Sequence, residues 1–238
     1  LTPAMANSGF VIGGYAVERL IKQGGMGKVY FARDSRGMPV AVKVLDLAAI
    51  GVHPTAFYKK AFRDEYEIQC QLADSTRHVV RPYAFNYDER LGTYYLVMEY
   101  APKSLQEMLE RGPQPLQQAA RILQDVGRGL HVANSRGVIH RDVKPSNILF
   151  RASGEAILGD FGISKVVNRP GLATRLGHPM GTAQYMSPEQ ILNRPLDGRS
   201  DAYSLAAVAF EMMGGAPPFN GDWHAVVNAH LTMPPPRL

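Results

Sequence analysis

The most telling part of the sequence reads His140-Arg141-Asp142-Val143-Lys144-Pro145-Ser146-Asn147, and Asp160-Phe161-Gly162 follows it. The first run places a carboxylate, an ammonium group and a side-chain amide close together on a predicted loop. The second adds another carboxylate at the end of a predicted strand. A group that orients a hydroxyl, a cation and oxygen ligands for Mg²⁺ are what phosphoryl transfer requires.

Composition sets wide bounds on the protein. The chain has 238 residues, of which 45% are hydrophobic and 20% charged, as in an ordinary globular domain. The formal net charge is +5, which more often reflects a solvated surface than an anionic partner. No basic tract with interleaved aromatic residues is present, so we expect no nucleic acid partner.

The sequence also supports expectations about the location of the protein and about whether the chain is complete. The single cysteine, Cys70, excludes an intrachain disulfide and agrees with a reducing compartment, so we expect a cytoplasmic protein. No apolar run reaches the ~18 residues that a membrane span needs. The chain begins with Leu1, so we expect it to be cut from something longer. The intracellular domain of a membrane-anchored protein is therefore left open.

The pattern of residues predicts a strand-rich first part and a helix-rich second part. Short β-type runs cover residues 15–21, 29–32, 40–45, 79–87 and 94–99, and a helix is predicted for 57–73. From Ser104 the pattern turns helical, beginning with a capping box to Glu107. Apolar residues at spacings of three and four then predict one buried helix face, formed by Leu116, Ala120, Leu123, Val126 and Leu130. Residues 204–213 are almost wholly apolar and predict a helix buried on all sides, and 222–231 predict a last short helix.

Further motifs lie upstream of the loop. They read Gln23-Gly24-Gly25-Met26-Gly27-Lys28-Val29, Val40-Ala41-Val42-Lys43 and Leu96-Val97-Met98-Glu99-Tyr100-Ala101. Taken singly, the glycines indicate a hairpin, the lysine a surface charge and the last run a core strand. Together with the loop, in this order, the set resembles the catalytic domain of eukaryotic-like (Hanks-type) protein kinases. The residues of several of its motifs are most similar to those of bacterial serine/threonine kinases.

The resemblance implies an α+β, bilobal kinase fold. It consists of a β-rich N-lobe with one long helix (residues 1–98) and a mostly helical C-lobe (residues 99–238), which together form one kinase domain. The family domain normally continues past Leu238 with further helices, so we expect a C-lobe that is truncated. Glu189, which pairs with an arginine of that later segment in the family, is expected to lack this partner.

The resemblance also implies roles for individual residues. Asp142 would be the catalytic base, Lys144 would neutralise charge on the γ-phosphate, and Asn147 and Asp160 would bind Mg²⁺, with Mn²⁺ as an alternative. Lys43 would bind the α- and β-phosphates of ATP and pair with Glu65, for which Asp64 and Glu67 are competitors. The remaining nucleotide contacts would come from Gly24, Gly25, Gly27, Val29, Ala41, Glu99, Ala101 and Leu149. The family's first glycine is replaced here by Lys22.

Supporting and regulatory roles follow from the same resemblance. His140 would pack on Phe161 and not act as a base, and Asp201 would anchor the backbone of the catalytic loop. The run Gly181-Thr182-Ala183-Gln184-Tyr185-Met186-Ser187-Pro188-Glu189 resembles the end of an activation segment, with Thr182 near the acceptor hydroxyl. Thr174 is our hypothesis for an autophosphorylation site, with Ser164 as the other candidate and Arg141 as the group that pairs with the phosphate.

The implied activity is transfer of the γ-phosphoryl group of Mg·ATP to a Ser or Thr hydroxyl of a protein substrate. A homodimer is left open. The first alternative is a pseudokinase that binds nucleotide or scaffolds partners. Lys22 and the short C-lobe are the features that favour it. The second is a kinase for small molecules, whose members generally lack a segment like residues 181–189.

Overall fold

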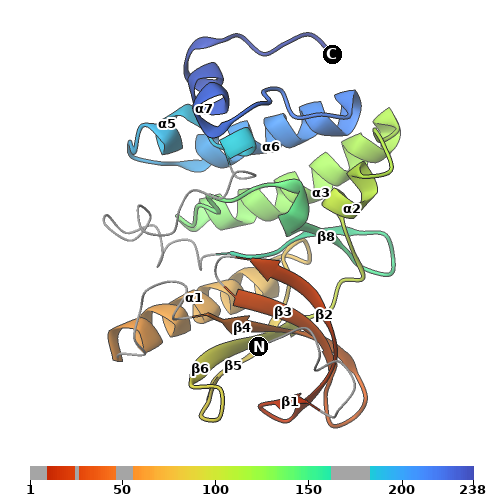
Figure 1. Ribbon diagram of the computed structural model, residues 1–238, viewed down its shortest axis with the longest axis vertical. Helices are drawn as coiled ribbons and strands as arrows, with labels where there is room; N and C mark the ends of the chain where they lie inside the picture. Colours follow the sequence, from red (N-terminus) through yellow and green to blue (C-terminus); the bar gives the residue numbers. More distant parts are fainter. Residues whose placement is uncertain (1–9, 25–26, 47–55, 162–182) are drawn as a thin grey trace. The chain divides into compact units, whose positions relative to one another are not determined.

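The computed structural model describes residues 10–24, 27–46, 56–161 and 183–238, without the side chains of residues 56–59, 61 and 65 (Figure 1). The chain divides into two compact units. Of the described residues, the first unit holds those within 10–71 and 80–100, and the second holds those within 72–79, 101–161 and 183–238. Each unit is described by itself below.

The first unit is built on an antiparallel sheet. Its strands are β1 (Val11–Ile12), β2 (Tyr15–Gly24), β3 (Gly27–Arg33), β4 (Pro39–Leu45), β5 (Pro82–Asp88) and β6 (Thr93–Glu99). They lie in the order β1-β2-β3-β4-β6-β5. The predicted strands are confirmed with one exception: residues 79–81 precede β5, and Val79 instead makes an isolated parallel bridge to Leu158 in the second unit.

The two faces of this sheet carry different residues of β4. Val40, Val42 and Val97 project to one side and pack with Ile12, Ala32 and Tyr95 into a hydrophobic core. Ala41 and Lys43 alternate with the valines of β4 and therefore lie on the opposite face. Both are nearly buried, at 6% and 7% exposure, so β4 is covered on both sides.

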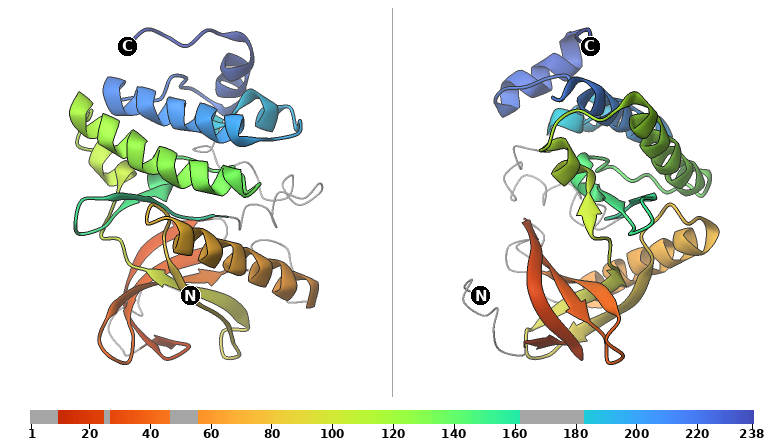
Figure 2. Two further views of the ribbon diagram at one scale, coloured as in Figure 1. Left: turned by 180° about the vertical axis from the view of Figure 1, so that it is seen from behind. Right: turned by 90° about the vertical axis from the view of Figure 1, so that its right-hand side faces the viewer.

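Helix α1 (Ala56–Ser75) packs against β5 and β6 through aromatic side chains (Figure 2). The ring of Phe62 lies 6.1 Å from that of Tyr94 and 6.5 Å from that of Phe85. Further along the helix, Gln69 is buried and its Nε2 donates a 3.1 Å hydrogen bond to the carbonyl of Val80. Since that bond satisfies the amide, a polar residue is tolerated at this buried position.

The second unit is mostly helical. It contains α2 (Leu105–Leu109), α3 (Leu116–Ser135), α5 (Pro188–Ile191), α6 (Gly198–Gly214) and α7 (Trp223–Thr232), with short 3₁₀ turns η2 (Pro145–Asn147) and η3 (Ala183–Tyr185). A small sheet, β7 (Lys103–Ser104), β8 (Ile148–Phe150) and β9 (Ala156–Leu158), lies beside α2 and α3 (Figures 1 and 2). The capping box predicted at Ser104 and Glu107 is confirmed.

The predicted buried faces of two helices need correction. In α3 the buried residues are Ala119, Ile122, Val126, Gly129, Leu130 and Ala133, whereas Leu116 is 73% exposed and Ala120 is exposed. The face is rotated because Gly129 must lie against the segment before β5: a Cβ at this position would come within 2.8 Å of the carbonyl of His78. In α6, Met213 is 38% exposed, so this helix is not buried on all sides among the described residues.

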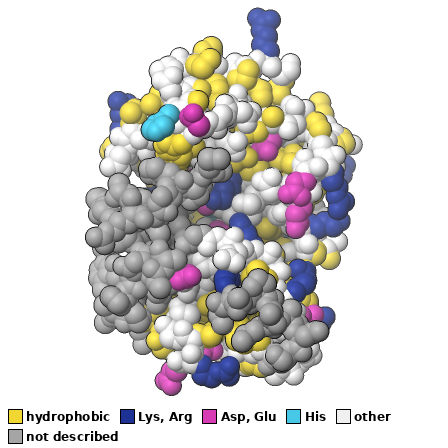
Figure 3. All heavy atoms as spheres, in the orientation of Figure 1, with side chains coloured by type: hydrophobic (Ala, Val, Ile, Leu, Met, Phe, Trp, Pro, Cys, Tyr) yellow, Lys and Arg dark blue, Asp and Glu magenta, His cyan; other side chains and the backbone are white. Residues whose placement is uncertain are grey.

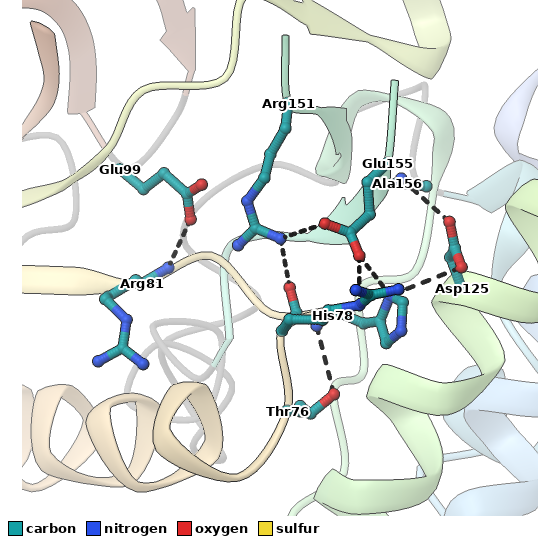
Figure 4. A network of polar contacts seen from close by, with 9 residues as sticks. Thr76, His78, Arg81, Glu99, Asp125, Arg151, Glu155 and Ala156 are labelled. Carbon is teal, nitrogen blue, oxygen red and sulfur yellow. Dashed lines mark hydrogen bonds and ion pairs between the residues drawn. The ribbon is translucent and has the colours of Figure 1, made fainter. Parts of the chain in front are cut away.

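Polar contacts tie the segment before β5 to the rest of the second unit (Figure 4). Glu155, before β9, accepts from Arg151 at 2.9 Å and lies 2.6 Å from Nε of Arg77. His78 Nδ1 lies 3.7 Å from a carboxylate oxygen of Asp125, and the backbone N–H of Leu158 donates to the carbonyl of His78. These contacts connect residues 76–78 to α3 and to the turn between β8 and β9.

The helices of the described residues include none that is both long enough and apolar enough to cross a membrane.

Candidate active site

The loop before η2 has a backbone shape that is fixed from α6. Arg141 has a positive φ of 69°, which is strained for a residue with a side chain. The two carboxylate oxygens of Asp201 accept from the backbone N–H groups of His140 and Arg141, each at 2.9 Å. Burial raises the pKa of Asp201, against the opposing effect of His140 and the two N–H groups. The predicted anchoring role of Asp201 is confirmed.

Asp142, Lys144 and Asn147 lie within hydrogen-bonding distance of one another. Nδ2 of Asn147 donates to the carbonyl oxygen and to Oδ2 of Asp142, both at 2.9 Å, and Lys144 Nζ lies 2.8 Å from the same Oδ2. The side chains of Asp142 and Lys144 are 23% and 22% exposed. A carboxylate held in this way is positioned to accept a proton from a hydroxyl group, and its lysine remains accessible to an anion.

The oxygen of the Asn147 side chain is suited to a metal ion. Asn147 is 2% exposed, and its Oδ1 has no hydrogen-bond partner within the described residues. The carbonyl of Asn147 accepts from the N–H of Gly159 at 2.9 Å, which brings the next residue, Asp160, alongside; Asp160 has a φ of 59°. One carboxylate and one amide oxygen fit Mg²⁺, which keeps several waters and takes further ligands from substrate phosphates.

His140 contributes to the structure of the loop. Its ring lies 4.5 Å from the ring of Phe161 in an edge-to-face arrangement, as predicted. Its Nε2 is 2.8 Å from the carbonyl of Gly159, and its Nδ1 accepts from the N–H of Asp142 at 3.2 Å. With both ring nitrogens engaged, His140 links the loop to residues 159–161 and is not placed as a general base.

The start of α5 supplies a contact that the sequence analysis missed. Ser187 and Gln190 form a capping box, and Nε2 of Gln190 also donates to the carbonyl of Arg141 at 2.8 Å. The S-x-x-Q pattern could have indicated the box, but not the second bond. Glu189 was expected to lack its family partner, an arginine. In the structure its carboxylate has another partner, because the hydroxyl of Ser200 donates to it at 2.5 Å.

Two polar pairs lie around η3, one of them buried and the other partly buried. The hydroxyl of Tyr185 donates to Glu211 on α6 at 2.6 Å, and the hydroxyl of Tyr203 is 2.8 Å from Nδ1 of His230 on α7. Burial raises the pKa of Tyr185 and of Glu211 and lowers that of His230. No sequence motif identified these pairs, because each joins residues far apart in the chain.

The first unit carries the predicted phosphate-binding residues on one face of its sheet. Val29 on β3 lies directly opposite Lys43 on β4, and Ala41 lies two residues before Lys43. Paired residues of neighbouring strands project to the same side, so Val29, Ala41 and Lys43 share a face with Met98, the partner of Ala41 on β6. Lys22 is paired with Val29 from β2.

The glycine-rich turn joins β2 and β3, where Gly24 is paired with Gly27. Gly27 has a φ of +141°, and a Cβ there would lie 1.9 Å from the carbonyl of Val44, so only glycine fits. Gly25 lies outside the described residues, as do Gly162, Ser164, Thr174, Gly181 and Thr182. Glu65 lies in α1, but its side chain is also outside the described set.

The other predicted nucleotide contacts are divided between the units. Glu99 ends β6, where its N–H donates to the carbonyl of Arg81 at 2.8 Å and its carboxylate accepts from the N–H of Arg81 at 3.3 Å (Figure 4). In the second unit, Ala101 is half-buried, and Leu149 lies in β8 opposite Ile157. The structure thus brings together the predicted residues of the loop and, separately, those of the sheet face.

Comparison with known proteins identifies the family. The model described as "Protein kinase domain" matches residues 15–234. The chain is 40% identical over 231 residues to "Serine/threonine-protein kinase PknA" of Mycobacterium tuberculosis, which covers 95% of this chain and 53% of that protein. It is 36% identical over 233 residues to "Serine/threonine-protein kinases PknA" of Corynebacterium glutamicum, covering 94% of this chain and 48% of the relative. It is 35% identical over 240 residues to "Serine/threonine-protein kinase PknD" of Mycobacterium tuberculosis, covering 100% of this chain and 35% of the relative.

The chain therefore spans about half, or less, of the length of these relatives. It belongs to the protein kinase domain family.

Proposed function

We propose that this chain is a serine/threonine protein kinase that transfers the γ-phosphoryl group of Mg·ATP to a protein hydroxyl. The observation that carries the proposal is the arrangement of Asp142, which contacts Asn147 and Lys144. Beside it lies the buried amide oxygen of Asn147, which has no hydrogen-bond partner in the described part of the chain. The names of the related kinases support the same acceptor class.

The residues of the loop and Asp160 have separate proposed roles in phosphoryl transfer. Asp142 accepts or orients the proton of the substrate hydroxyl, and Lys144 neutralises charge on the transferred group. Asn147 and Asp160 would hold Mg²⁺, with Mn²⁺ as an alternative, and the bound ion would supply compensation for the phosphate charges. The Nζ of Lys144, 2.8 Å from Oδ2 of Asp142, holds this carboxylate in its orientation.

The sheet of the first unit would bind the nucleotide. Lys43 would contact the α- and β-phosphates and pair with Glu65, and Val29 and Ala41 would lie against the base and sugar. We propose that residues 1–98 and 99–238 act as the two lobes of one catalytic domain. The proposal requires Lys43 and Asp142 to act on the same ATP molecule.

The decisive experiment is a transfer assay with radiolabelled ATP, Mg²⁺ and a generic protein acceptor. We expect the wild type to label Ser or Thr, and Asp142→Asn to lose about 10³-fold or more in rate. The matched control is Asp74→Asn, which makes the same chemical change at an exposed carboxylate of α1 that has no proposed role in catalysis. Binding of ATP without any transfer by the wild type would identify a nucleotide-binding pseudokinase instead. Label found only on small molecules would identify the other rival.

Regulation by autophosphorylation is part of the proposal. Nε of Arg141 is buried and has no hydrogen-bond partner among the described residues, so a phosphate on Thr174 would find a donor next to Asp142. Mass spectrometry of the autophosphorylated wild type should report phosphate on Thr174, and Thr174→Ala should lower the activity. Unchanged activity and phosphopeptide yield in this variant would remove Thr174 from the proposal and leave Ser164.

A further inference from the structure

A groove on the second unit belongs to none of the residues assigned above. It has a volume of about 570 Å³ and lies between β7, α2, the start of α3 and the turn that follows β8. Phe150 and Ile122, both nearly buried, form its floor. Pro102 and Pro115, both exposed, and the half-buried Met108 add accessible apolar surface along its walls. A volume of this size accommodates a small ligand or a few residues of a peptide.

Two basic side chains of the groove have no hydrogen-bond or ion-pair partner among the described residues. Lys103 and Arg121 line it from β7 and α3, and both are exposed. Neither side chain makes a hydrogen bond or an ion pair to any other described residue. Figure 3 shows basic side chains at the right-hand edge of the molecule, where Figure 1 places α2 and the start of α3. Acidic side chains are visible beside them.

The other charged groups that line the groove are already engaged with protein atoms. Arg151 donates to Glu155 at 2.9 Å and to the carbonyl of Arg77 at 2.6 Å (Figure 4). Asp125 accepts from the N–H of Ala156 at 3.3 Å, with one of its oxygens 3.7 Å from the ring of His78. Of the charged side chains that line the groove, Lys103 and Arg121 are thus the two that no other described residue engages.

The first turn of α3 adds to this positive character. Its N-cap is Pro115, which makes no side-chain cap, and the turn contains no acidic residue. Gln117 and Gln118 of this turn line the groove. The N-terminal end of a helix carries a partial positive charge that stabilises a nearby carboxylate. Leu116, in the same turn but not among the lining residues, is 73% exposed.

We propose that this groove is a docking site for a short acidic segment of a partner protein. The segment would place carboxylates against Lys103 and Arg121 and an apolar side chain between them, over Met108. The partner would be a substrate or a regulator that the kinase domain holds by a sequence distinct from the phosphorylated one. A basic segment is disfavoured, because it would bring like charges together over an apolar floor.

The test is direct binding, measured by fluorescence anisotropy with a short labelled peptide in which aspartate and leucine alternate. It needs neither ATP nor Mg²⁺, so its outcome is independent of the proposed catalytic activity. We expect saturable binding that weakens with added salt. Combining Lys103→Glu with Arg121→Glu should weaken it about tenfold or more. A peptide with lysine in place of aspartate should not bind.

The matched control is Arg128→Glu. Arg128 is exposed on the same helix, undergoes the same charge reversal and does not line the groove, so the variant should bind the acidic peptide like the wild type. An equal loss in this control would show attraction to net charge alone and overturn the site. No binding by the wild type, or equal binding of the lysine peptide, would also overturn it. Since all three side chains are exposed, the variants should fold, which circular dichroism would verify.

Discussion

One amide nitrogen joins Asn147 to Asp142 twice: Nδ2 donates to the carbonyl and to the carboxylate of Asp142, both at 2.9 Å. This arrangement leaves Oδ1 of Asn147 buried, with no hydrogen-bond partner among the described residues. A buried acceptor without a partner costs free energy. Oδ1 of Asn147 is therefore available to bind a ligand, whereas Nδ2 of the same side chain orients the proposed catalytic base.

Asn147→Ala tests whether both ends of this amide are used. We expect transfer to fall about 100-fold and the Mg²⁺ concentration for half-maximal rate to rise, because the variant loses a metal ligand and frees the carboxylate of Asp142. The measurement is a titration of the transfer rate with Mg²⁺ at saturating ATP. Gln124→Ala, at an exposed position of α3, is the control. A loss of rate with an unchanged Mg²⁺ requirement would contradict the metal role.

Asp201→Asn should lower both activity and stability. An amide offers one acceptor oxygen, whereas the carboxylate of Asp201 accepts from two backbone N–H groups. One buried N–H group would lose its partner, which costs about 1–3 kcal/mol of the free energy of unfolding. The strained backbone at Arg141 would also lose support, and kcat should fall more than the KM for ATP changes. Full activity in this variant would show that α6 does not shape the loop.

Residues close together in the chain were predictable from the sequence, and distant pairs were not. Asp142, Lys144 and Asn147 share one short loop, so their closeness could be predicted from their spacing in the sequence. The pairing of Tyr185 with Glu211 depends on how η3 and α6 pack, and nothing local indicates it. For the same reason, the partner of Glu189 could not be named in advance.

The misplaced face of α3 has a comparable cause. Apolar spacing predicted Leu116 and Ala120 as core positions, but hydrophobic periodicity gives no weight to glycine. Gly129 controls the orientation, because a larger residue there would collide with the carbonyl of His78. The helix therefore buries Gly129 along with the neighbouring apolar residues of that face and leaves Leu116 at the surface.

His230 should make the stability of the second unit depend on pH. Burial lowers the pKa of His230 below its ordinary value of 6.5, so the unfolded chain binds this proton more tightly than the folded one. The stability contributed by the neutral ring is then fully present above 6.5 and is lost as the pH falls below 6.5 toward the lowered value. The slope due to one such group is at most about 1.4 kcal/mol per pH unit.

Urea unfolding at about pH 7.5 and about pH 5.5 measures this effect. His230→Gln should reduce the difference between the two pH values, since glutamine does not titrate. His224→Gln is the matched control, because His224 is exposed on the same helix and should keep the wild-type difference. If the control flattens the dependence as much as His230→Gln does, the assignment to His230 fails.

Ser200→Ala should destabilise the protein and make it less sensitive to acid. Burial alone would raise the pKa of Glu189, yet the hydrogen bond from Ser200 leads the contacts that bring this pKa below its ordinary value of 4.5. A group whose pKa is lowered by folding contributes stability that is present above 4.5 and is lost as the pH falls through the folded value. Removing the hydroxyl should cost about 1–2 kcal/mol near neutral pH, the size of a hydrogen bond to a partly exposed charge.

The cost should shrink as Glu189 becomes protonated. We therefore expect the wild type and Ser200→Ala to differ most near neutral pH and to converge below about pH 4 in denaturant unfolding. Ser153→Ala, which removes a hydroxyl from an exposed turn, should match the wild type throughout. A gap between Ser200→Ala and the wild type that stays constant down to acidic pH would mean that Ser200 acts through packing. The ionised carboxylate of Glu189 would then not be what holds α5 to α6, since the charged form accepts the stronger hydrogen bond from the hydroxyl.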